Sequence, residues 1–377
     1  PRADRREFLQ ASVGTAAAAA LSVARPRGAQ AQGNAAPPGP PRIRFAAIGL
    51  NHGHISGQTA AVVRGGGELV SFYAKEPDLA AAYGKRYPGA RLVKDEREIL
   101  EDPKIQLVVS AGIPNERAPL GVRVMRAGKD YLVDKPGITT LEQLEEVRRV
   151  QAETRRIYSI CYSERLENRA TAKAGELVKA GAIGKVVQTV GLGPHRANLP
   201  TRPAWFFVRE QYGGILCEIA SHQFDQFLFF TGSTKAEVVA SQVANVNHPQ
   251  HPGLEDFGDA LVRGDGGSGY IRVDWFTPGG LKTWGDGRLT ILGTDGFIEI
   301  RKNIDLAGRE GGNHLFLVDQ KETRHVDCTD VALPYGSQLV DDVLHRTETA
   351  MPQAHCFLAM ELAIRAQANA QRVRFSA

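Results

Sequence analysis

The chain has 377 residues, of which 42 % are hydrophobic and 23 % are charged, so its composition is that of a folded globular protein and not of a disordered one. Its net charge of +4 comes largely from residues 1–31, which hold five Arg and two acidic residues. The remainder is close to neutral and carries no electrostatic signature of nucleic-acid binding. The length exceeds what one hydrophobic core usually serves, which predicts two domains.

Residues 1–31 have the features of an export signal. The pair Arg5-Arg6 precedes an alanine-rich apolar stretch over residues 11–24, and Ala29-Gln30-Ala31 offers a small-residue cleavage site. The apolar stretch is too short to span a bilayer and no other stretch is longer, so we expect no membrane span in the mature chain. These features predict export by the twin-arginine route to the periplasm or another extracytoplasmic space. Residues 32–42, rich in Pro, Gly and Ala, are a predicted linker.

Residues 43–54 (IRFAAIGLNHGH) combine a short apolar run with a glycine turn, and a helical pattern begins near Ile55. A strand, a glycine turn and a helix bring backbone N–H groups and the positive helix end to a phosphate. The dinucleotide fingerprint G-x-G-x-x-G/A follows such a strand, but only its first glycine is present here, because Asn51 and His54 occupy the other two slots. The residues of this turn that we assign to cofactor binding are Gly49, Asn51, His52, Gly53 and His54.

Strands and helices alternate through residues 43–162, which predicts a doubly wound parallel sheet of the Rossmann type with helices on both faces. Ligands of such sheets bind beyond the carboxyl ends of the strands. The further strands are predicted at residues 68–73, 105–110, 131–133 and 157–162, and the helices at residues 77–87, 117–127 and 140–154.

The end of the second predicted strand bears on the choice of cofactor. An Asp or Glu is usual here because it binds the adenosine ribose, but this chain has Ala74 followed by Lys75. The loss of a carboxylate beside a cation suits a 2′-phosphate, so the sequence slightly favours NADP over NAD. The alternative is that Lys75 is solvated and Glu76 takes the part of the acid.

Three further stretches resemble the Gfo/Idh/MocA family of oxidoreductases, which includes glucose–fructose oxidoreductase and inositol dehydrogenase. They are Asp134-Lys135-Pro136 with the preceding Pro114-Asn115, the run GGILCEIASHQFD at residues 213–225, and residues 285–296. The family has E-K-P where this chain has D-K-P, and an Asp where Glu218 stands. The resemblance covers about residues 43–372. It implies that Pro114, Asn115, Asp134 and Lys135 contact a nicotinamide cofactor.

The chemistry of an alcohol dehydrogenase requires a base for the hydroxyl proton while hydride leaves. Lys135 on a strand-end loop, with Glu218 and His222 four residues apart, is the predicted catalytic set. On one helix face, Glu218 and His222 would equally suit two metal ligands, with His195 as a third, or a buried structural pair. We predict no metal. The four scattered cysteines form no C-x-x-C pair and are interpreted as buried apolar residues.

The loop at residues 193–207 mixes Arg, His and Asn with three aromatic residues and three prolines. Aromatic faces surrounded by polar groups are typical of a sugar pocket, whereas the alternative is a structural loop or a subunit contact. A helix is predicted before it, at residues 164–180, and a strand at residues 186–192. The predicted substrate-binding residues, from this loop and its surroundings, are Tyr162, Arg165, His195, Asn198, Arg202, Trp205 and Tyr212.

The remainder of the chain alternates in strand fashion and ends in two helices. Strands are predicted at residues 237–245, 258–263, 269–275, 288–292 and 296–301, and helices at residues 337–345 and 355–370. Residues 163–377 therefore form a predicted α+β domain with a large, mainly antiparallel open sheet for substrate binding and oligomerisation. The family resemblance implies subunit contacts on the open face, hence a homodimer or homotetramer.

Export affects the expected function, since the periplasm has no free nicotinamide pool. We therefore expect a tightly bound NADP or NAD that is regenerated in place. The first hypothesis is an oxidoreductase acting on a CH–OH group of a sugar or polyol. The second is redox-neutral cleavage of a glycoside by oxidation, elimination and reduction with the same cofactor. The third is a sugar-binding protein without catalysis, suggested by Asn51 and His54 in the glycine slots.

Overall fold

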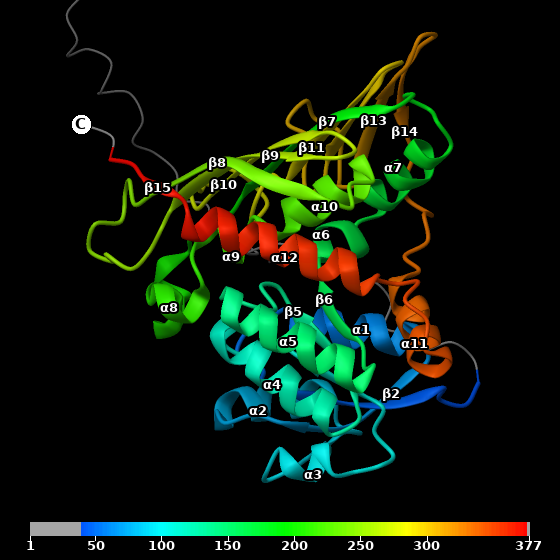
Figure 1. Ribbon diagram of the computed structural model, residues 1–377, viewed down its shortest axis with the longest axis vertical. Helices are drawn as coiled ribbons and strands as arrows, with labels where there is room; N and C mark the ends of the chain where they lie inside the picture. The colour runs from blue at the N-terminus through cyan, green and yellow to red at the C-terminus, as the bar shows by residue number, and fades with distance from the viewer. Residues whose placement is uncertain (1–38, 375–377) are drawn as a thin grey trace, which may run out of the picture. The chain divides into compact units, whose positions relative to one another are not determined.

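The computed structural model describes residues 39–374, so the predicted export signal and most of the predicted linker lie outside the described residues. Within residues 39–374 the strands form one sheet of six strands and one of nine (Figure 1). All strands of the first sheet precede residue 162, and all strands of the second follow it. This arrangement is the predicted combination of a Rossmann sheet with a mainly antiparallel sheet.

The first sheet is entirely parallel, with the strand order β3-β2-β1-β4-β5-β6. Its central strands are almost completely buried, which explains why they are continuous apolar runs in the sequence. The strands are β1 (Ile43–Ile48), β2 (Gly67–Tyr73), β3 (Arg91–Leu92), β4 (Leu107–Ser110), β5 (Asp130–Asp134) and β6 (Tyr158–Cys161).

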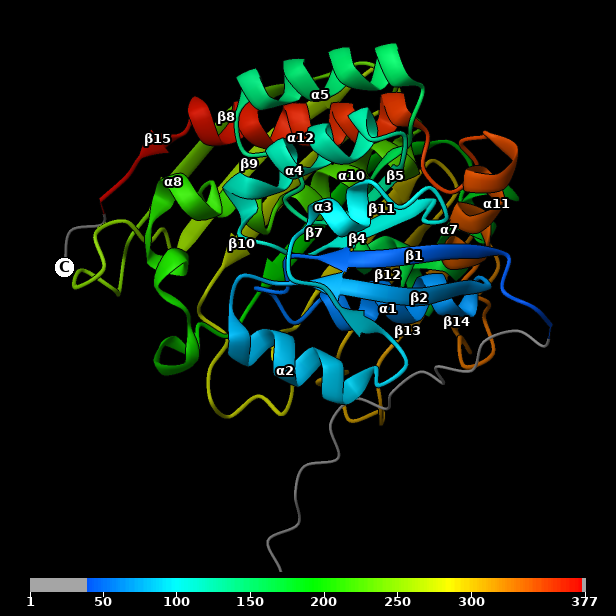
Figure 2. The ribbon, with the colours of Figure 1, turned by 90° about the horizontal axis from the view of Figure 1, so that it is seen from below.

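Helices cover both faces of this sheet, with α1 and α2 on one face and α4 and α5 on the other (Figure 2). The helix α4 begins at Pro114, three residues before the predicted start, because proline is well suited to the first helical turn. As a result, Asn115 lies in that turn and Arg117 lies inside the helix. The helices are α1 (Ile55–Arg64), α2 (Pro77–Arg86), α3 (Arg97–Leu100), α4 (Pro114–Arg126) and α5 (Leu141–Thr154).

The single helix predicted at residues 164–180 is wrong. The structure has two helices instead, α6 (Ser163–Leu166) and α7 (Arg169–Lys179). The reason is Asn168, whose extended backbone and side-chain oxygen, 2.9 Å from the N–H of Thr171, form a new N-cap.

A long connection of short elements follows β7 (Val186–Pro194). Glu218 and His222 do not share one helix, as the prediction assumed, because α9 ends at Glu218 and α10 begins at Ser221. The elements of this connection are η2 (Leu199–Thr201), η3 (Ala204–Phe207), α8 (Arg209–Tyr212), α9 (Ile215–Glu218) and α10 (Ser221–Thr231).

The second sheet has the order β14-β13-β12-β11-β7-β10-β9-β8-β15, and only the pairs β7–β10 and β8–β15 are parallel. The helices α10 and α12 lie along one face (Figure 1). Three of its strands, β13, β14 and β15, were not predicted. The remaining elements are β8 (Ala236–Ala244), β9 (Phe257–Gly264), β10 (Ser268–Asp274), β11 (Arg288–Gly293), β12 (Phe297–Arg301), β13 (His314–Val318), β14 (Thr323–Val326), α11 (Tyr335–His345), α12 (Gln353–Ala368) and β15 (Gln371–Arg372).

One apolar core includes side chains from both sheets, such as Phe45 of β1, Tyr158 of β6 and Ile271 of β10. The four cysteines are buried and unpaired, as predicted. Among the helices of residues 39–374, none combines the length and the apolar character that a bilayer crossing requires.

Candidate functional site

The carboxyl ends of β1, β2 and β4 enclose a pocket of about 220 Å³. Gly49, directly after β1, has a φ of +79°, and a Cβ there would lie 3.0 Å from the Cα of Gly112. Only glycine fits this position, which leaves the backbone open to a close ligand. The buried Oδ1 of Asn115, which also lines the pocket, has no hydrogen-bond partner among residues 39–374. An open backbone and an unpaired buried oxygen fit the binding of a dinucleotide.

The second and third glycine slots of the fingerprint are occupied without strain. Asn51 Nδ2 donates to Glu76 Oε1 at 2.7 Å and so ties the turn to the end of β2. His54 is the residue before α1, and its side chain is 43 % exposed. The imidazole turns toward Asp134 and the neighbouring cavity, so it is not buried in the contact between helix and strand that normally requires a small residue.

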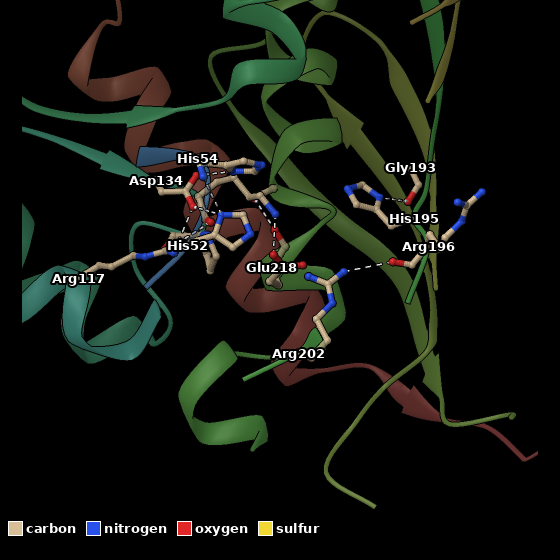
Figure 3. A network of polar contacts seen from close by, with 12 residues as sticks. His52, His54, Arg117, Asp134, Gly193, His195, Arg196, Arg202 and Glu218 are labelled. Atoms are coloured by element: carbon tan, nitrogen blue, oxygen red, sulfur yellow. Dashed lines mark hydrogen bonds and ion pairs between the residues drawn. The ribbon is translucent and has the colours of Figure 1, made fainter. Parts of the chain in front are cut away.

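Asp134, the last residue of β5, holds both histidines of this turn. The Nδ1 atoms of His52 and His54 lie 3.2 and 3.0 Å from its two carboxylate oxygens (Figure 3). These ligand atoms lie within 4.8 Å of one another, a set that could hold a divalent metal ion. Hydrogen bonds from the two histidines to an ionised Asp134 explain the same arrangement of side chains without a metal. The absence of a metal stays a prediction.

Arg117 organises the loop after β5 from inside α4. Its guanidinium is buried and lies 3.2 Å from Asp134 Oδ2, and it donates to the carbonyl oxygens of Gly112, Lys135 and Pro136. Burial opposes ionisation of Asp134, but the charges of His54 and Arg117 outweigh it and hold the pKa of that carboxyl well below its usual range. Arg117 therefore fixes the backbone that presents Lys135.

Lys135, which follows β5 of the first sheet, meets Glu218 at the end of α9. The ammonium donates to Glu218 Oε1 at 2.6 Å, and the side chains of Lys135 and Glu218 are only 3 % and 12 % exposed. Burial alone would raise the pKa of Glu218, but the ammonium lowers it to about 2. Burial lowers the pKa of His222 to about 3, so this imidazole is neutral. Glu218 Oε2 and His222 Nδ1 are buried without a hydrogen-bond partner in the described part of the chain.

These groups line a larger cavity of about 430 Å³ between the cofactor turn and the second sheet. Its walls combine imidazoles and aromatic rings with three cations and three carboxylates, a composition suited to a polar ligand with hydrocarbon faces. The side chains that line it are those of His52, His54, Lys135, Ser163, Glu164, Glu167, Asn168, His195, Arg202, Trp205, Phe206, Glu218, His222, Trp275, Trp284, Lys302 and Asn303.

The outer wall is formed by the loop after β7. His195 Nδ1 lies 3.0 Å from the carbonyl oxygen of Gly193, and its ring contacts those of Trp275 and Trp284. Burial, followed by the charge of Lys135, lowers the pKa of His195 to about 4. This ring therefore presents a neutral surface to a ligand.

Four predicted substrate-binding residues do not line the cavity. Tyr162 and Tyr212 are buried, with hydroxyls that donate to the carbonyl oxygens of Cys356 and Gly253. Arg165 forms a two-bonded ion pair with Asp225 at 2.7 Å, and the exposed Asn198 donates to Thr201 Oγ1. Their polar groups already have partners inside the protein, and their part in substrate binding stays a prediction. His195, Arg202 and Trp205 do line the cavity.

Sequence reasoning missed several lining residues, above all Glu164 and Lys302. Lys302 Nζ lies 2.6 Å from Glu164 Oε2, although the two are 138 positions apart. Glu164 was hidden in the predicted long helix, and Lys302 directly follows β12 at a strand end. The place of Lys302 at a strand end is the one sequence signal that could have assigned it to the site.

Two tryptophans of the cavity wall differ in exposure. Trp275 is buried, whereas Trp284 is 51 % exposed.

Comparisons with known proteins agree with this geometry. Residues 43–162 match the model of an oxidoreductase family with an NAD-binding Rossmann fold, and residues 171–299 match that of the GFO/IDH/MocA C-terminal domain. A levoglucosan dehydrogenase of Pseudarthrobacter phenanthrenivorans is 28 % identical over 205 residues. This match covers 52 % of this chain and only 51 % of the relative, so the chain spans about half of that enzyme.

Two solved structures share the fold. An oxidoreductase-like protein from Erwinia carotovora atroseptica SCRI1043 is 46 % identical with a TM-score of 0.86, over 88 % of this chain and all of the other. A levoglucosan dehydrogenase in complex with NADH is 17 % identical with a TM-score of 0.71, over 86 % of this chain and 97 % of the other, which shows the fold alone. The resemblance seen in the sequence is confirmed, and the chain belongs to the Gfo/Idh/MocA family of oxidoreductases.

Proposed function

We propose that this protein transfers hydride between a tightly held nicotinamide dinucleotide and a CH–OH group of a sugar or polyol. The observation that carries the proposal is the buried pair Lys135–Glu218, with Nζ and Oε1 2.6 Å apart, in the wall of the aromatic cavity. At this pair, Glu218 Oε2 and the nearby His222 Nδ1 have no hydrogen-bond partner among residues 39–374. Buried polar atoms without partners are costly, so they indicate a ligand with hydroxyl groups.

In the proposed hydride transfer, each of these residues has a separate role. Gly49, Asn51 and Asn115 would hold the dinucleotide, whose nicotinamide would accept or supply the hydride. The neutral His222 takes the hydroxyl proton during oxidation and returns it during reduction. The Lys135 ammonium stabilises negative charge that develops on the reacting oxygen, in a site that excludes water. Glu218, already ionised, orients Lys135 and accepts a hydrogen bond from a second hydroxyl through Oε2.

The proposal is tested by denaturing the purified protein and identifying any released nucleotide by mass. The loaded protein is then assayed for nicotinamide reduction with a panel of sugars and polyols. Lys135→Met is expected to lower the rate by about 10²- to 10⁴-fold, the range for loss of a positioned proton-transfer or charged group. Lys85→Met, on the exposed side of α2, is the matched control. A protein that binds neither NAD nor NADP would contradict the proposal and support a sugar-binding role.

Redox-neutral glycoside cleavage would use the same residues and differs in its products. A glycoside would then release its aglycone while the nicotinamide absorbance shows no net change. Simple oxidation of a free sugar instead leaves one reduced nicotinamide for each oxidised product. Measuring both quantities in one single-turnover experiment separates these two reactions.

The cofactor preference depends on two neighbouring residues with opposite effects. The ammonium of Lys75 would favour the 2′-phosphate of NADP. In the structure it lies 3.1 Å from Glu116 Oε2. Glu76 lines the same pocket and suits the ribose hydroxyls of NAD. We retain NADP as the slightly favoured cofactor. Lys75→Ala should weaken NADP binding selectively, whereas selective loss of NAD affinity in Glu76→Gln would reverse the preference.

Export and self-association are two further parts of the proposal. Replacing Arg5 and Arg6 by Lys should keep the protein in the cytoplasm, whereas unchanged export would contradict the twin-arginine route. The open face of the second sheet supports a homodimer or homotetramer, since apolar side chains stay exposed on several of its strands. Light scattering of a Leu261→Glu variant should then show a monomer. The exposed side chains are those of Val187, Val239, Leu261, Leu292 and Phe297.

A further inference from the structure

The three carboxylates that line the large cavity are all neutralised by a cation. Each accepts at least one hydrogen bond from an ammonium or guanidinium group, so none of them needs a positive charge from the ligand. The cavity therefore carries no uncompensated negative charge. The three pairs are Glu164–Lys302, Glu218–Lys135 and Glu167–Arg64.

Arg202 is the cavity's remaining cation, and it has no acidic partner. No carboxylate of residues 39–374 lies within ion-pair distance of its guanidinium. Glu218, which is farther away, acts on the pKa of Arg202 only through its charge. Burial lowers the pKa of Arg202, although a guanidinium stays charged in proteins. The cavity is thus left with one unpaired, partly desolvated positive charge, which favours an anionic ligand.

The guanidinium of Arg202 is held rigidly by the loop after β7. Its Nε and Nη2 donate to the carbonyl oxygens of Ala197 and Arg196 at 2.8 and 3.1 Å. Its flat face lies 4.5 Å from the ring of Phe206 and 4.9 Å from that of Trp275. Nη1 makes no hydrogen bond within the described chain. A stacked guanidinium with a free donor, turned toward Glu218 (Figure 3), is preorganised to bind an oxyanion.

We propose that the substrate is a sugar acid, a polyhydroxylated molecule with a carboxylate, and that Arg202 binds this carboxylate. That the substrate is a sugar rests on the proposed function, whereas the inference that it carries a carboxylate rests on the geometry of Arg202. One unpaired cation matches the single charge of a carboxylate, but a phosphate monoester carries nearly two charges at neutral pH. Glu218 does not oppose this placement strongly, because Lys135 already neutralises it. The aromatic walls then contact the C–H faces of the sugar.

The experiment measures binding to the nucleotide-loaded protein by calorimetry. Each sugar acid, among them glucuronate, galacturonate and gluconate, is compared with its neutral counterpart and with glucose 6-phosphate. At least one acid is expected to bind about 10- to 100-fold more tightly than its neutral partner, the range for one charge-assisted hydrogen bond. Arg202→Gln should weaken binding of the acid by a much larger factor than binding of the neutral partner, and Arg202→Lys should keep part of the preference.

Arg196→Gln is the matched control from the same loop. Its guanidinium donates to the carbonyl oxygens of Pro278, Leu281 and Thr283, and Figure 3 shows it turned away from Arg202 and Glu218. This variant should therefore retain the preference for the acid. It also shows whether loss of an arginine merely disturbs the loop.

The inference is overturned if no acid binds more tightly than its neutral partner, if glucose 6-phosphate exceeds every carboxylate, or if Arg202→Gln weakens both partners equally. The nucleotide content and the oxidation of neutral polyols are measured on the same protein. Nucleotide-dependent oxidation without a preference for acids would overturn only this inference. Acid binding that depends on Arg202, in a protein without nucleotide, would instead overturn the proposed function.

Discussion

The turn after β1 and the loop after β7 face the same cavity but are stabilised in different ways. In the turn, Asp134 receives hydrogen bonds from His52 and His54 and is itself held by Arg117, so one buried carboxylate organises the whole region. In the loop, Arg196 and Arg202 bind backbone carbonyl oxygens, and Arg202 also stacks on the rings of Phe206 and Trp275. The turn therefore depends on a few buried charges, whereas the loop depends on many smaller contacts.

This difference predicts unequal tolerance of substitution. Removing one partner of a buried ion pair leaves an uncompensated charge, which costs more than the pair itself contributed. Removing a guanidinium that binds carbonyl oxygens near the surface lets water replace it. We expect the cofactor turn to be the less tolerant region and the loop to be the one where specificity can change.

The largest expected effect comes from Arg117→Met. It leaves Asp134 buried without its cation and should lower the free energy of unfolding by about 3–5 kcal/mol, measured by urea denaturation. Arg196→Met in the loop should cost only about 1 kcal/mol. Adding Asp134→Asn to Arg117→Met should recover part of the loss. Equal costs for the two arginines would remove the distinction between the regions.

A comparable effect on catalysis is expected for His222→Gln. Glutamine keeps a polar side chain but cannot take up a proton, so the rate of the hydride-transfer step should fall by about 10²- to 10⁴-fold. Binding of the dinucleotide, measured separately, should be unchanged. His325→Gln, on the exposed strand β14, serves as the control. A loss smaller than tenfold would assign the proton transfer to another group.

A smaller effect concerns pH. Burial lowers the pKa of His222 from 6.5 to about 3, so this ring stays neutral in the folded protein while the unfolded chain takes up a proton below pH 6.5. Its contribution to stability is therefore complete above pH 6.5 and is lost as the pH falls toward 3. As the pH falls from 6 to 4.5, the free energy of unfolding of His222→Gln should decrease less steeply than that of the wild-type protein. The two slopes should differ by about 1 kcal/mol per pH unit. Identical slopes would show that the ring is not buried in its neutral form.

The smallest effect is expected at the rim of the loop. Trp284 lines the cavity but is 51 % exposed, so Trp284→Ala should change the free energy of unfolding by less than about 1 kcal/mol. The KM for the substrate should rise several-fold, with kcat nearly unchanged, if the indole only contacts the sugar face. An equal fall in kcat would mean that the loop also positions the reacting atoms.

The sequence predicted elements whose pattern is local and missed contacts between distant residues. Most strands of the two sheets follow from apolar runs and alternation, although β3, β13, β14 and β15 were not predicted, and Lys135 follows from a strand-end motif. The break at Asn168 was missed because a single capping residue interrupts an otherwise helical pattern. Arg117 and Lys302 were missed for a different reason: nothing in the neighbouring sequence shows that a lysine or arginine will be buried against a distant carboxylate.

The most direct test of the central claim is a single turnover of the nucleotide-loaded protein with its substrate. Nicotinamide absorbance reports hydride transfer, and a pH-indicator dye reports the proton. We predict that the wild-type protein releases one proton for each hydride transferred and that Lys135→Met and His222→Gln slow both signals together. Unchanged rates in both variants would contradict the assignment of catalysis to Lys135, Glu218 and His222.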